Sequence, residues 1–134
     1  MDKLDILQDW YRRVWIDGDL SAIDRFFVPR AGADGLMPDG QVGAEDFRAL
    51  VRDLDIRIDQ SMEQGDRLWA QMTVTALGAH DMRPIRITGQ VMMRFQDSLI
   101  IEAYNSFDFL TFFSQAGLLP EDAFLLLLSG ERMG

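Results

Sequence analysis

A single acid stands where an apolar strand pattern gives way to an aromatic helical one, and it is the residue best placed for proton chemistry. Asp108 follows residues 100–107 and precedes the helical pattern of residues 109–117. A carboxylate in an apolar cavity loses hydration, so its pKa is expected to rise toward neutrality and allow proton exchange beside a carbonyl. Asp108 is therefore a candidate general acid or base.

Two further residues are candidates for the same chemistry. Tyr104 shares the strand parity of Asp108 and could donate a hydrogen bond to a developing enolate. His80, the only histidine, precedes the third predicted long strand and could complete an acid–base couple with Asp108. Each has a structural alternative: Asp108 as the cap of the following helix, Tyr104 as a core residue with a satisfied hydroxyl, and His80 as a turn residue.

The cavity that this chemistry needs would be lined by apolar and aromatic side chains. The simplest interpretation of the tryptophans and Tyr11 is that they belong to the core. The eight methionines indicate apolar cavity walls that can adapt to a flexible ligand. Instead of binding a ligand, the Asn105 side chain could bridge backbone groups at the edge of the sheet. The candidate ligand-binding residues are Tyr11, Trp15, Trp69, Met93, Asn105 and Phe112.

Composition narrows the partners and cofactors. A net charge of -9 repels phosphate backbones, so nucleic acid is not an expected partner. The chain has no cysteine and one histidine, and it has no acidic loop of calcium-binding spacing, so neither a metal nor another cofactor is expected. The N-terminus lacks the apolar core of a signal peptide, and no run approaches the roughly 20 apolar residues of a membrane span. A cytoplasmic protein without membrane contact is expected.

Hydrophobic periodicity predicts helices followed by strands. Helical spacing covers residues 3–17, 19–27 and 43–53, with a loop rich in glycine and proline between residues 28 and 43. From residue 55 the period changes to two, which predicts antiparallel strands. These strands are expected at residues 55–64, 67–77, 85–95 and 99–108. Residues 1–134 are thus expected to form one α+β domain, with the helices on one face of a curved sheet.

Two apolar features predict contacts beyond this core. The last strand is apolar on both parities, so its outer face is expected to meet a second copy and form a homodimer. A C-terminal helical extension covers about residues 118–130, and residues 124–128 are apolar all round. That helix is expected either to close over the mouth of the pocket or to pack on a partner subunit.

Several short motifs occur in an order that resembles one family. They are residues 15–19, residues 43–47, Gly65-Asp66-Arg67, Thr88-Gly89 and residues 104–108. Over residues up to about 117 the chain resembles the SnoaL-like polyketide cyclase branch of the nuclear transport factor 2-like superfamily. The resemblance implies a cone-shaped, cystatin-like fold, in which a strongly curved, mainly antiparallel sheet wraps around N-terminal helices and leaves a cavity open at one end.

The resemblance also implies a possible activity. In the polyketide cyclases of this family, an acid at the end of the last strand serves as general acid or base in an aldol ring closure, and Asp108 matches it. A histidine that is frequent in cyclases is replaced here by Ala103. Three functions follow as hypotheses: a cyclase, isomerase or dehydratase acting on an apolar carbonyl or ring substrate; non-catalytic binding of a small apolar metabolite; or a dimeric scaffold with no ligand.

Overall fold

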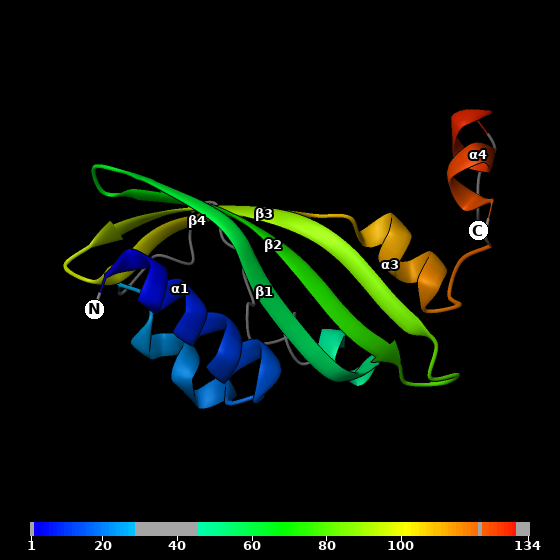
Figure 1. The fold of residues 1–134 in the computed structure, drawn as a ribbon, viewed down its shortest axis with the longest axis horizontal. Helices are drawn as coiled ribbons and strands as arrows, with labels where there is room; N and C mark the ends of the chain where they lie inside the picture. Colours follow the sequence, from blue (N-terminus) through cyan, green and yellow to red (C-terminus); the bar gives the residue numbers. More distant parts are fainter. Residues whose placement is uncertain (1, 29–45, 121, 131–134) are drawn as a thin grey trace.

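The computed structural model describes residues 2–28, 46–120 and 122–130, and its centre is one antiparallel sheet. The strands follow one another in the order β1-β2-β3-β4 and bend strongly, with the N-terminal helices on one side (Figure 1). This α+β architecture confirms the predicted fold class. The elements in chain order are α1 (Lys3–Trp10), the π-helix η1 (Tyr11–Ile16), the 3-10 helix η2 (Leu20–Arg25), β1 (Val51–Gln64), β2 (Arg67–Gly78), β3 (Pro84–Gln96), β4 (Leu99–Phe107), α3 (Phe109–Gln115) and α4 (Ala123–Leu128).

The first predicted helix exists but changes its winding midway. Asp2 caps α1 by accepting a hydrogen bond of 2.8 Å from the backbone N–H of Asp5. From Tyr11 onward the chain widens into the π-helix η1, which Gly18 ends with a φ of +75°. The predicted helix over residues 19–27 is confirmed in part, as the shorter η2.

The predicted helix over residues 43–53 is wrong in its second half. Residues 46–49 are helical, but β1 already begins at Val51, which pairs with Gly78 of β2. Asp53 lies at a φ of +53°, within an irregularity of the β1–β2 register. Sheet pairing satisfies the backbone groups of these residues and so overrides their local helical periodicity. Residues 29–45 lie outside the described residues. They comprise nearly all of the expected loop and the first three residues of this predicted helix.

The four predicted strands are confirmed. Gly65 and Asp66 turn β1 into β2, and Asp97 and Ser98 turn β3 into β4 with φ angles of +51° and +68°. Two consecutive left-handed residues are the conformation that a tight hairpin requires. The parallel bridge of Phe27 to Ile100 ties the end of the N-terminal helical segment to β4. Ile100 N–H donates to the Phe26 carbonyl over 2.7 Å, and Val28 N–H donates to the Ile100 carbonyl over 3.0 Å.

A bulge in β4 explains why this strand is apolar on both parities. Phe95 pairs with Ile100 whereas Arg94 pairs with Glu102, so Ile101 is an extra residue. The extra residue reverses the parity, and Ile100 and Ala103 are both buried on the face that the helices cover. The predicted faces of β4 are therefore wrong, because Ala103 and Phe107 share the helix-covered face with Ile100, and Tyr104 lies on the outer face. Dimerisation through the outer face stays a prediction.

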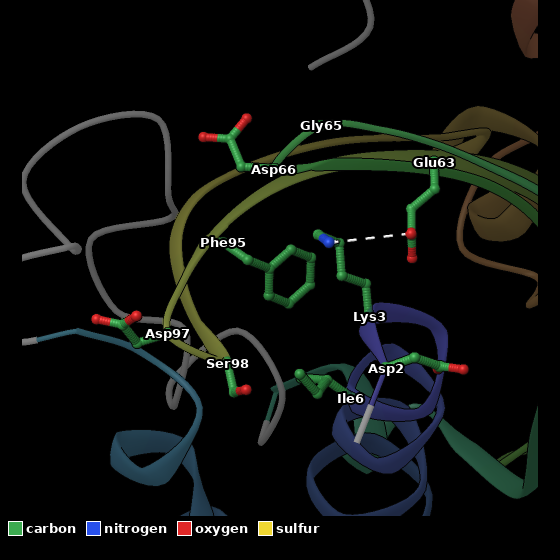
Figure 2. Close-up of a pocket in the computed structure, with 9 residues that line it drawn as sticks. All are labelled: Asp2, Lys3, Ile6, Glu63, Gly65, Asp66, Phe95, Asp97 and Ser98. Carbon is green, nitrogen blue, oxygen red and sulfur yellow. Dashed lines mark ion pairs between the residues drawn. The ribbon is translucent and has the colours of Figure 1, made fainter.

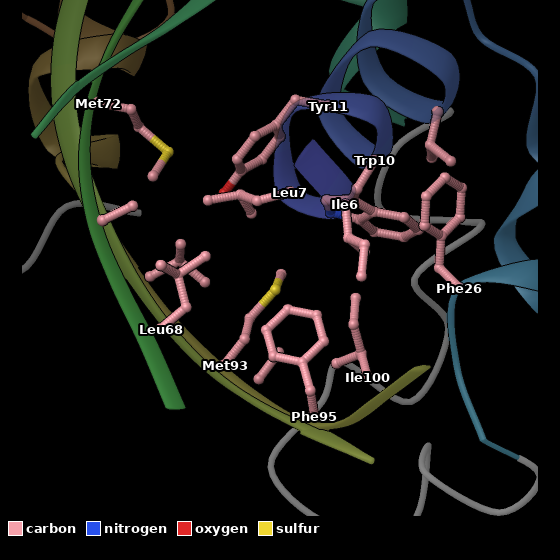
Figure 3. Packing of buried hydrophobic residues seen from close by; sticks show 14 of the residues in the cluster. Ile6, Leu7, Trp10, Tyr11, Phe26, Leu68, Met72, Met93, Phe95 and Ile100 are labelled. Carbon is pink, nitrogen blue, oxygen red and sulfur yellow. The ribbon is translucent and has the colours of Figure 1, made fainter. Parts of the chain in front are cut away.

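The concave face of the sheet, which α1 and η1 cover, carries the core in two groups. The first packs α1, η1 and η2 on one half of the face (Figure 3), and the second packs Phe47 and α3 on the other half. Ile56 and Phe107 touch both groups and are only partly buried. The first cluster comprises Ile6, Leu7, Trp10, Tyr11, Val14, Ala22, Phe26, Leu68, Ala70, Met72, Val91, Met93, Phe95, Ile100 and Ala103; the second comprises Val51, Val74, Ala76, Ile85, Ile87, Phe112 and Ala116.

Within the described residues, no helix is both long and apolar enough to cross a membrane.

Candidate ligand-binding site

Two hydrogen-bond donors on η1 are buried without a partner. The hydroxyl of Tyr11 and the indole Nε1 of Trp15 have no hydrogen-bond partner among the described residues. The side chains are four positions apart and so extend from the same side of the helix. Burial raises the pKa of Tyr11, so its phenol stays protonated and can donate. A buried donor without an acceptor costs about 1–3 kcal/mol, so an acceptor placed here would relieve that cost.

The surroundings of Trp15 are apolar and incompletely covered. Trp15 meets Phe47 edge to face, with ring centroids 5.6 Å apart, and Phe47 stacks on Phe112 at 4.9 Å. Trp15, Phe47, Ile56 and Phe107 are all only partly buried, although they lie where the two core clusters meet. We call these four residues the seam. Partial exposure of these four large apolar side chains provides an apolar surface around the Trp15 indole.

Arg48 fixes the end of η1 and with it the position of Trp15. Its Nε donates to the Trp15 carbonyl over 3.1 Å, which satisfies an acceptor left open at the helix end. The guanidinium lies against Gly18, where a Cβ atom would be 2.3 Å from Nη1. Gly18 is thus required for its left-handed backbone, and a side chain there would also displace the end of the Arg48 side chain. Arg48 was not among the predicted site residues.

The structure places three more predicted ligand-binding residues on the concave side. Met93 is buried among the residues of the first cluster (Figure 3). Phe112 has no exposed surface and forms the centre of the second cluster. Asn105 pairs with buried Val91 in the sheet register, and its own side chain is exposed. These residues share a side of the sheet with Tyr11 and Trp15.

Asp108 lies elsewhere, at the exposed N-terminus of α3. Its Oδ1 accepts from the Thr111 backbone N–H over 3.1 Å, and its Oδ2 accepts from the Thr111 hydroxyl over 2.6 Å. These bonds, the hydroxyl first, lower the pKa of Asp108 below its ordinary value. The expected rise of this pKa is therefore wrong, because the carboxylate is hydrogen-bonded in solvent rather than enclosed by apolar groups. The helix-cap alternative is the one that the geometry bears out.

The cap predicts a pH-dependent contribution of Asp108 to stability. Because its pKa is lowered in the folded chain, the carboxylate stabilises the fold at neutral pH and loses this effect as pH falls below 3.8. Asp108→Ala is expected to reduce the free energy of unfolding by about 1 kcal/mol at neutral pH. Urea denaturation at several pH values measures this loss, which should shrink in acid. Asp108→Asn, which keeps a capping oxygen, should lose less; an Asp108→Ala loss that is the same in acid would contradict the assignment.

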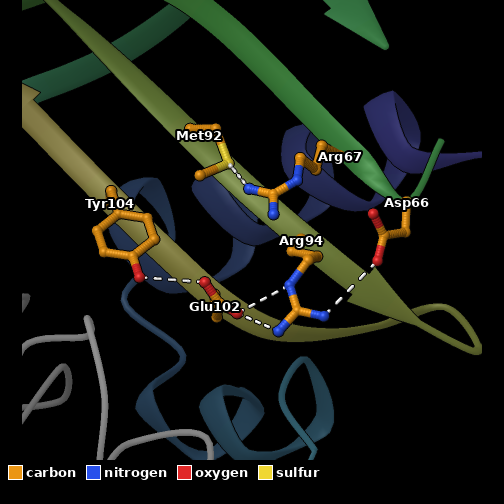
Figure 4. A network of polar contacts seen from close by, with 6 residues as sticks. All are labelled: Asp66, Arg67, Met92, Arg94, Glu102 and Tyr104. Carbon is orange, nitrogen blue, oxygen red and sulfur yellow. Dashed lines mark hydrogen bonds and ion pairs between the residues drawn. The ribbon is translucent and has the colours of Figure 1, made fainter. Parts of the chain in front are cut away.

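Tyr104 and Trp69 lie on the outer face of the sheet, opposite the helices. The Tyr104 hydroxyl donates to Glu102 Oε2 over 3.1 Å, and Glu102 also accepts from Arg94 Nε over 2.8 Å (Figure 4). The Arg94 hydrogen bond, followed by that of Tyr104, lowers the pKa of Glu102. Trp69 Nε1 donates to Gln90 Oε1 over 2.9 Å. The sheet separates both aromatic residues from the concave donors.

The third predicted catalytic residue, His80, is exposed in the turn between β2 and β3. Asp108 lies beside Thr88, whose carbonyl accepts its N–H over 3.2 Å. Thr88 is four residues along β3 from Pro84, about 13 Å at the rise of a strand. The register therefore separates His80 from Asp108 rather than forming the couple that was predicted.

Neither of two surface cavities with described walls is lined by Tyr11 or Trp15. One of about 350 Å³ lies between the start of α1 and the two hairpin turns (Figure 2). Three of its four acids have partners on the protein: Glu63 pairs with Lys3 at 3.9 Å, Asp66 pairs with Arg94 at 3.7 Å, and Asp2 caps α1. The other, about 240 Å³, lies on the outer face beside Gln71, Gln90 and Asp108. In the described parts of the chain, no group of three or more potential ligands is arranged to hold a metal ion.

The family is decided by a match over most of the chain. Residues 7–103 match the model of the SnoaL-like domain. The chain belongs to the SnoaL-like family. A search of proteins with curated functions found no match.

Solved structures of similar fold are distant in sequence. The chain resembles IdmH of Streptomyces antibioticus, proposed to be a polyketide cyclase, at 20% identity and a TM-score of 0.70, with 87% of this chain and 99% of that chain covered. It resembles a proposed polyketide cyclase of Acidithiobacillus ferrooxidans at 19% identity and a TM-score of 0.69, covering 84% and 92%. A protein of Catenulispora acidiphila with a ketosteroid isomerase-like fold, in complex with trimethylamine, has 15% identity and a TM-score of 0.69, covering 87% and 95%. These likenesses show that the SnoaL-like chain has the nuclear transport factor 2-like fold that the sequence predicted.

Proposed function

We propose that this SnoaL-like protein binds a small, mainly apolar molecule against the seam, with Tyr11 and Trp15 donating hydrogen bonds to it. The observation that carries the proposal is the pair of buried donors without partners. Small-molecule sites combine an apolar lining with a few polar groups that fix orientation, and the seam beside two donors is such a combination. Membership of the SnoaL-like family is consistent with it.

The chemistry of the two donors defines the ligand class. An O–H and an N–H that only need acceptors favour a carbonyl, ether or hydroxyl oxygen. The edges and faces of Trp15, Phe47 and Phe107 favour a flat hydrocarbon or aromatic body. A neutral ligand fits better than an anion, because the chain carries a net charge of -9 and the four side chains of the seam are uncharged. The ligand class is therefore a neutral ring compound with one or two oxygen acceptors.

Binding is favoured over proton-transfer catalysis. Asp108, Tyr104 and His80 lie away from the donors, and the only polar or charged residue among the buried ones described, besides Tyr11, is Thr73. A cyclase, isomerase or dehydratase is the second candidate. It is favoured by the protonated Tyr11, whose hydroxyl could polarise a carbonyl, and by the proposed cyclase role of proteins with similar folds.

The experiment is a thermal-shift and calorimetric screen with fused-ring aromatic ketones and steroid ketones, compared with the same hydrocarbons lacking oxygen. Tyr11→Phe and Trp15→Phe are expected to weaken ketone binding about tenfold each, as for the loss of a hydrogen bond in a buried site. Tyr104→Phe on the outer face is the matched control and should leave affinity unchanged. Chromatography of the bound ketone after incubation distinguishes binding from turnover. Equal affinity of native protein and both η1 variants would refute the site.

The unpartnered hydroxyl also predicts an unusual stability effect without ligand. Tyr11→Phe removes a buried oxygen that has no hydrogen-bond partner among the described residues, so the free energy of unfolding is expected to rise by about 1 kcal/mol. Tyr104→Phe removes a hydroxyl bonded to Glu102, so it should lower the free energy or leave it unchanged. Urea denaturation of the ligand-free variants measures both. A destabilised Tyr11→Phe protein would mean that the hydroxyl is satisfied in solution.

A further inference from the structure

Exposed apolar surface is concentrated in the C-terminal tail, which we define as residues 118–128. Five of the nine large apolar side chains that are exposed in the described residues belong to it. Leu125 and Leu128 are 67% and 69% exposed, and α4 projects away from the sheet and the N-terminal helices (Figure 1). The five are Leu118, Phe124, Leu125, Leu127 and Leu128.

The helix at the end of this tail is too short to be stable without packing. α4 has six residues, and the side chain of its N-cap residue, Asp122, makes no capping hydrogen bond. Isolated helices shorter than about 12–15 residues are marginal in water, and most helical stability in proteins comes from packing an apolar face. In α4 only Ala123 is buried. The helix therefore needs a surface that covers its leucines.

We propose that a second copy of this chain covers the tail, with α4 of each copy packed against the tail of the other about a two-fold axis. Charge favours this occupant. The helix α4 itself, residues 123–128, has no charged side chain, so two copies of α4 can pack without like charges between them, although two acids directly precede α4 and each copy carries a net charge of -9. The same net charge opposes approach to an anionic lipid surface.

The area of the tail also fits a reciprocal contact better than a one-sided one. Five half-exposed large side chains offer on the order of 500 Å² of apolar surface in each copy, which is at the upper end for a patch on a monomer. Burying the tails of both copies removes on the order of 1,000 Å² from water, the lower limit for a specific interface. The tail is thus expected to give a dimer that depends on protein concentration.

Sedimentation velocity of the full chain over a range of concentrations tests the proposal. The native protein is expected to dimerise, and Leu125→Glu with Leu128→Glu is expected to weaken dimerisation at least tenfold, because two carboxylates would be buried in the contact. Met62→Glu is the matched control, since Met62 is 66% exposed but lies at the other end of the sheet, in β1. It should leave the dimer intact, and circular dichroism checks that all variants fold.

A variant on the outer face separates this dimer from the one predicted through the sheet. Tyr104→Glu changes an exposed residue of that face and should not affect association through the tail. The proposal is overturned if the native chain is monomeric at all concentrations, or if Tyr104→Glu dissociates the dimer and the tail variant does not. A monomer would also be the result if the tail covered the pocket of its own chain.

Cross-linking gives a second readout, because the chain has no cysteine. Single Leu125→Cys and Leu128→Cys variants are expected to form disulfide-linked dimers on mild oxidation faster than Met62→Cys. Equal rates for the three variants would overturn the proposal, because they would show that the tails meet only by random collision.

Discussion

Phe112→Ala is expected to lower the free energy of unfolding by about 3–5 kcal/mol, the range for truncating a fully buried phenylalanine. Phe112 has no exposed surface, and it stacks on Phe47 and meets the Phe113 ring edge to face at 5.3 Å. Truncation leaves a cavity at the centre of the second core cluster, which α3 and the far half of the sheet share. Urea or guanidinium denaturation, followed by tryptophan fluorescence, measures the loss.

The matched control for this substitution is Phe109→Ala in the same helix. Phe109 is 46% exposed and lies at the rim of the same aromatic group, so its truncation should cost about 1 kcal/mol. A similar cost for both substitutions would mean that α3 packs loosely on the sheet. In that case the second cluster would contribute less to the fold than its burial indicates.

Gly89→Ala is expected to destabilise the protein by about 1–3 kcal/mol through overpacking. A Cβ atom at this position would lie 2.2 Å from Cδ1 and 2.7 Å from Cγ of Phe107, its partner in β4. Cγ is close to the backbone, so rotation of the ring tip alone does not remove the clash. The same denaturation experiment measures the effect, and ligand binding should weaken as well because Phe107 belongs to the seam.

A double substitution tests the cause of the Gly89 effect. If the Phe107 ring is the obstacle, Gly89→Ala should cost little in a Phe107→Ala background, and the two single effects should not add. Full additivity of the two effects would show that alanine at position 89 disturbs something other than Phe107. The glycine would then be required for a reason that the contacts do not reveal.

The strands could be predicted from the sequence because a period of two persists over their whole length. Leu68, Ala70, Met72 and Val74 alternate with outward residues in β2 as the pattern indicated, and all four are buried. The start of β1 was missed because its residues also fit helical spacing, and only pairing with β2 decides between the two. Local patterns do not contain that information.

The faces of β4 were misassigned for one physical reason. Side-chain direction alternates with every residue, so the extra residue at the Ile101 bulge reverses the face of each later residue. Counting parity through the bulge places Tyr104 in the cavity, whereas it lies on the outer face with Glu102. A bulge of this kind has no sequence signature here, since Ile101 is neither glycine nor proline.

Residues from distant parts of the chain complete the site, and these were the hardest to predict. Tyr11 and Trp15 were identified because aromatic residues at helical spacing predict an inward face. Arg48 was not, because its bond to the Trp15 carbonyl spans 33 positions and an exposed arginine is common on any surface. The predicted role of Asp108 depended on its lying in an apolar cavity, and that of His80 on its lying beside Asp108, and only the folded chain could reveal either.

The N-terminal helices are held at two separate points, by Arg48 of the helical residues 46–49 and by β4, and this would limit how a ligand could enter. At one end the Arg48 side chain holds the last carbonyls of η1, and at the other Phe26 and Val28 share backbone hydrogen bonds with Ile100. A helical segment attached at one end could move away from the sheet as a rigid body, whereas attachment at both ends opposes such a movement. If a ligand binds at the seam as we propose, we expect it to enter through rotation of the rings of Trp15, Phe47 and Phe107 while the helices stay in place.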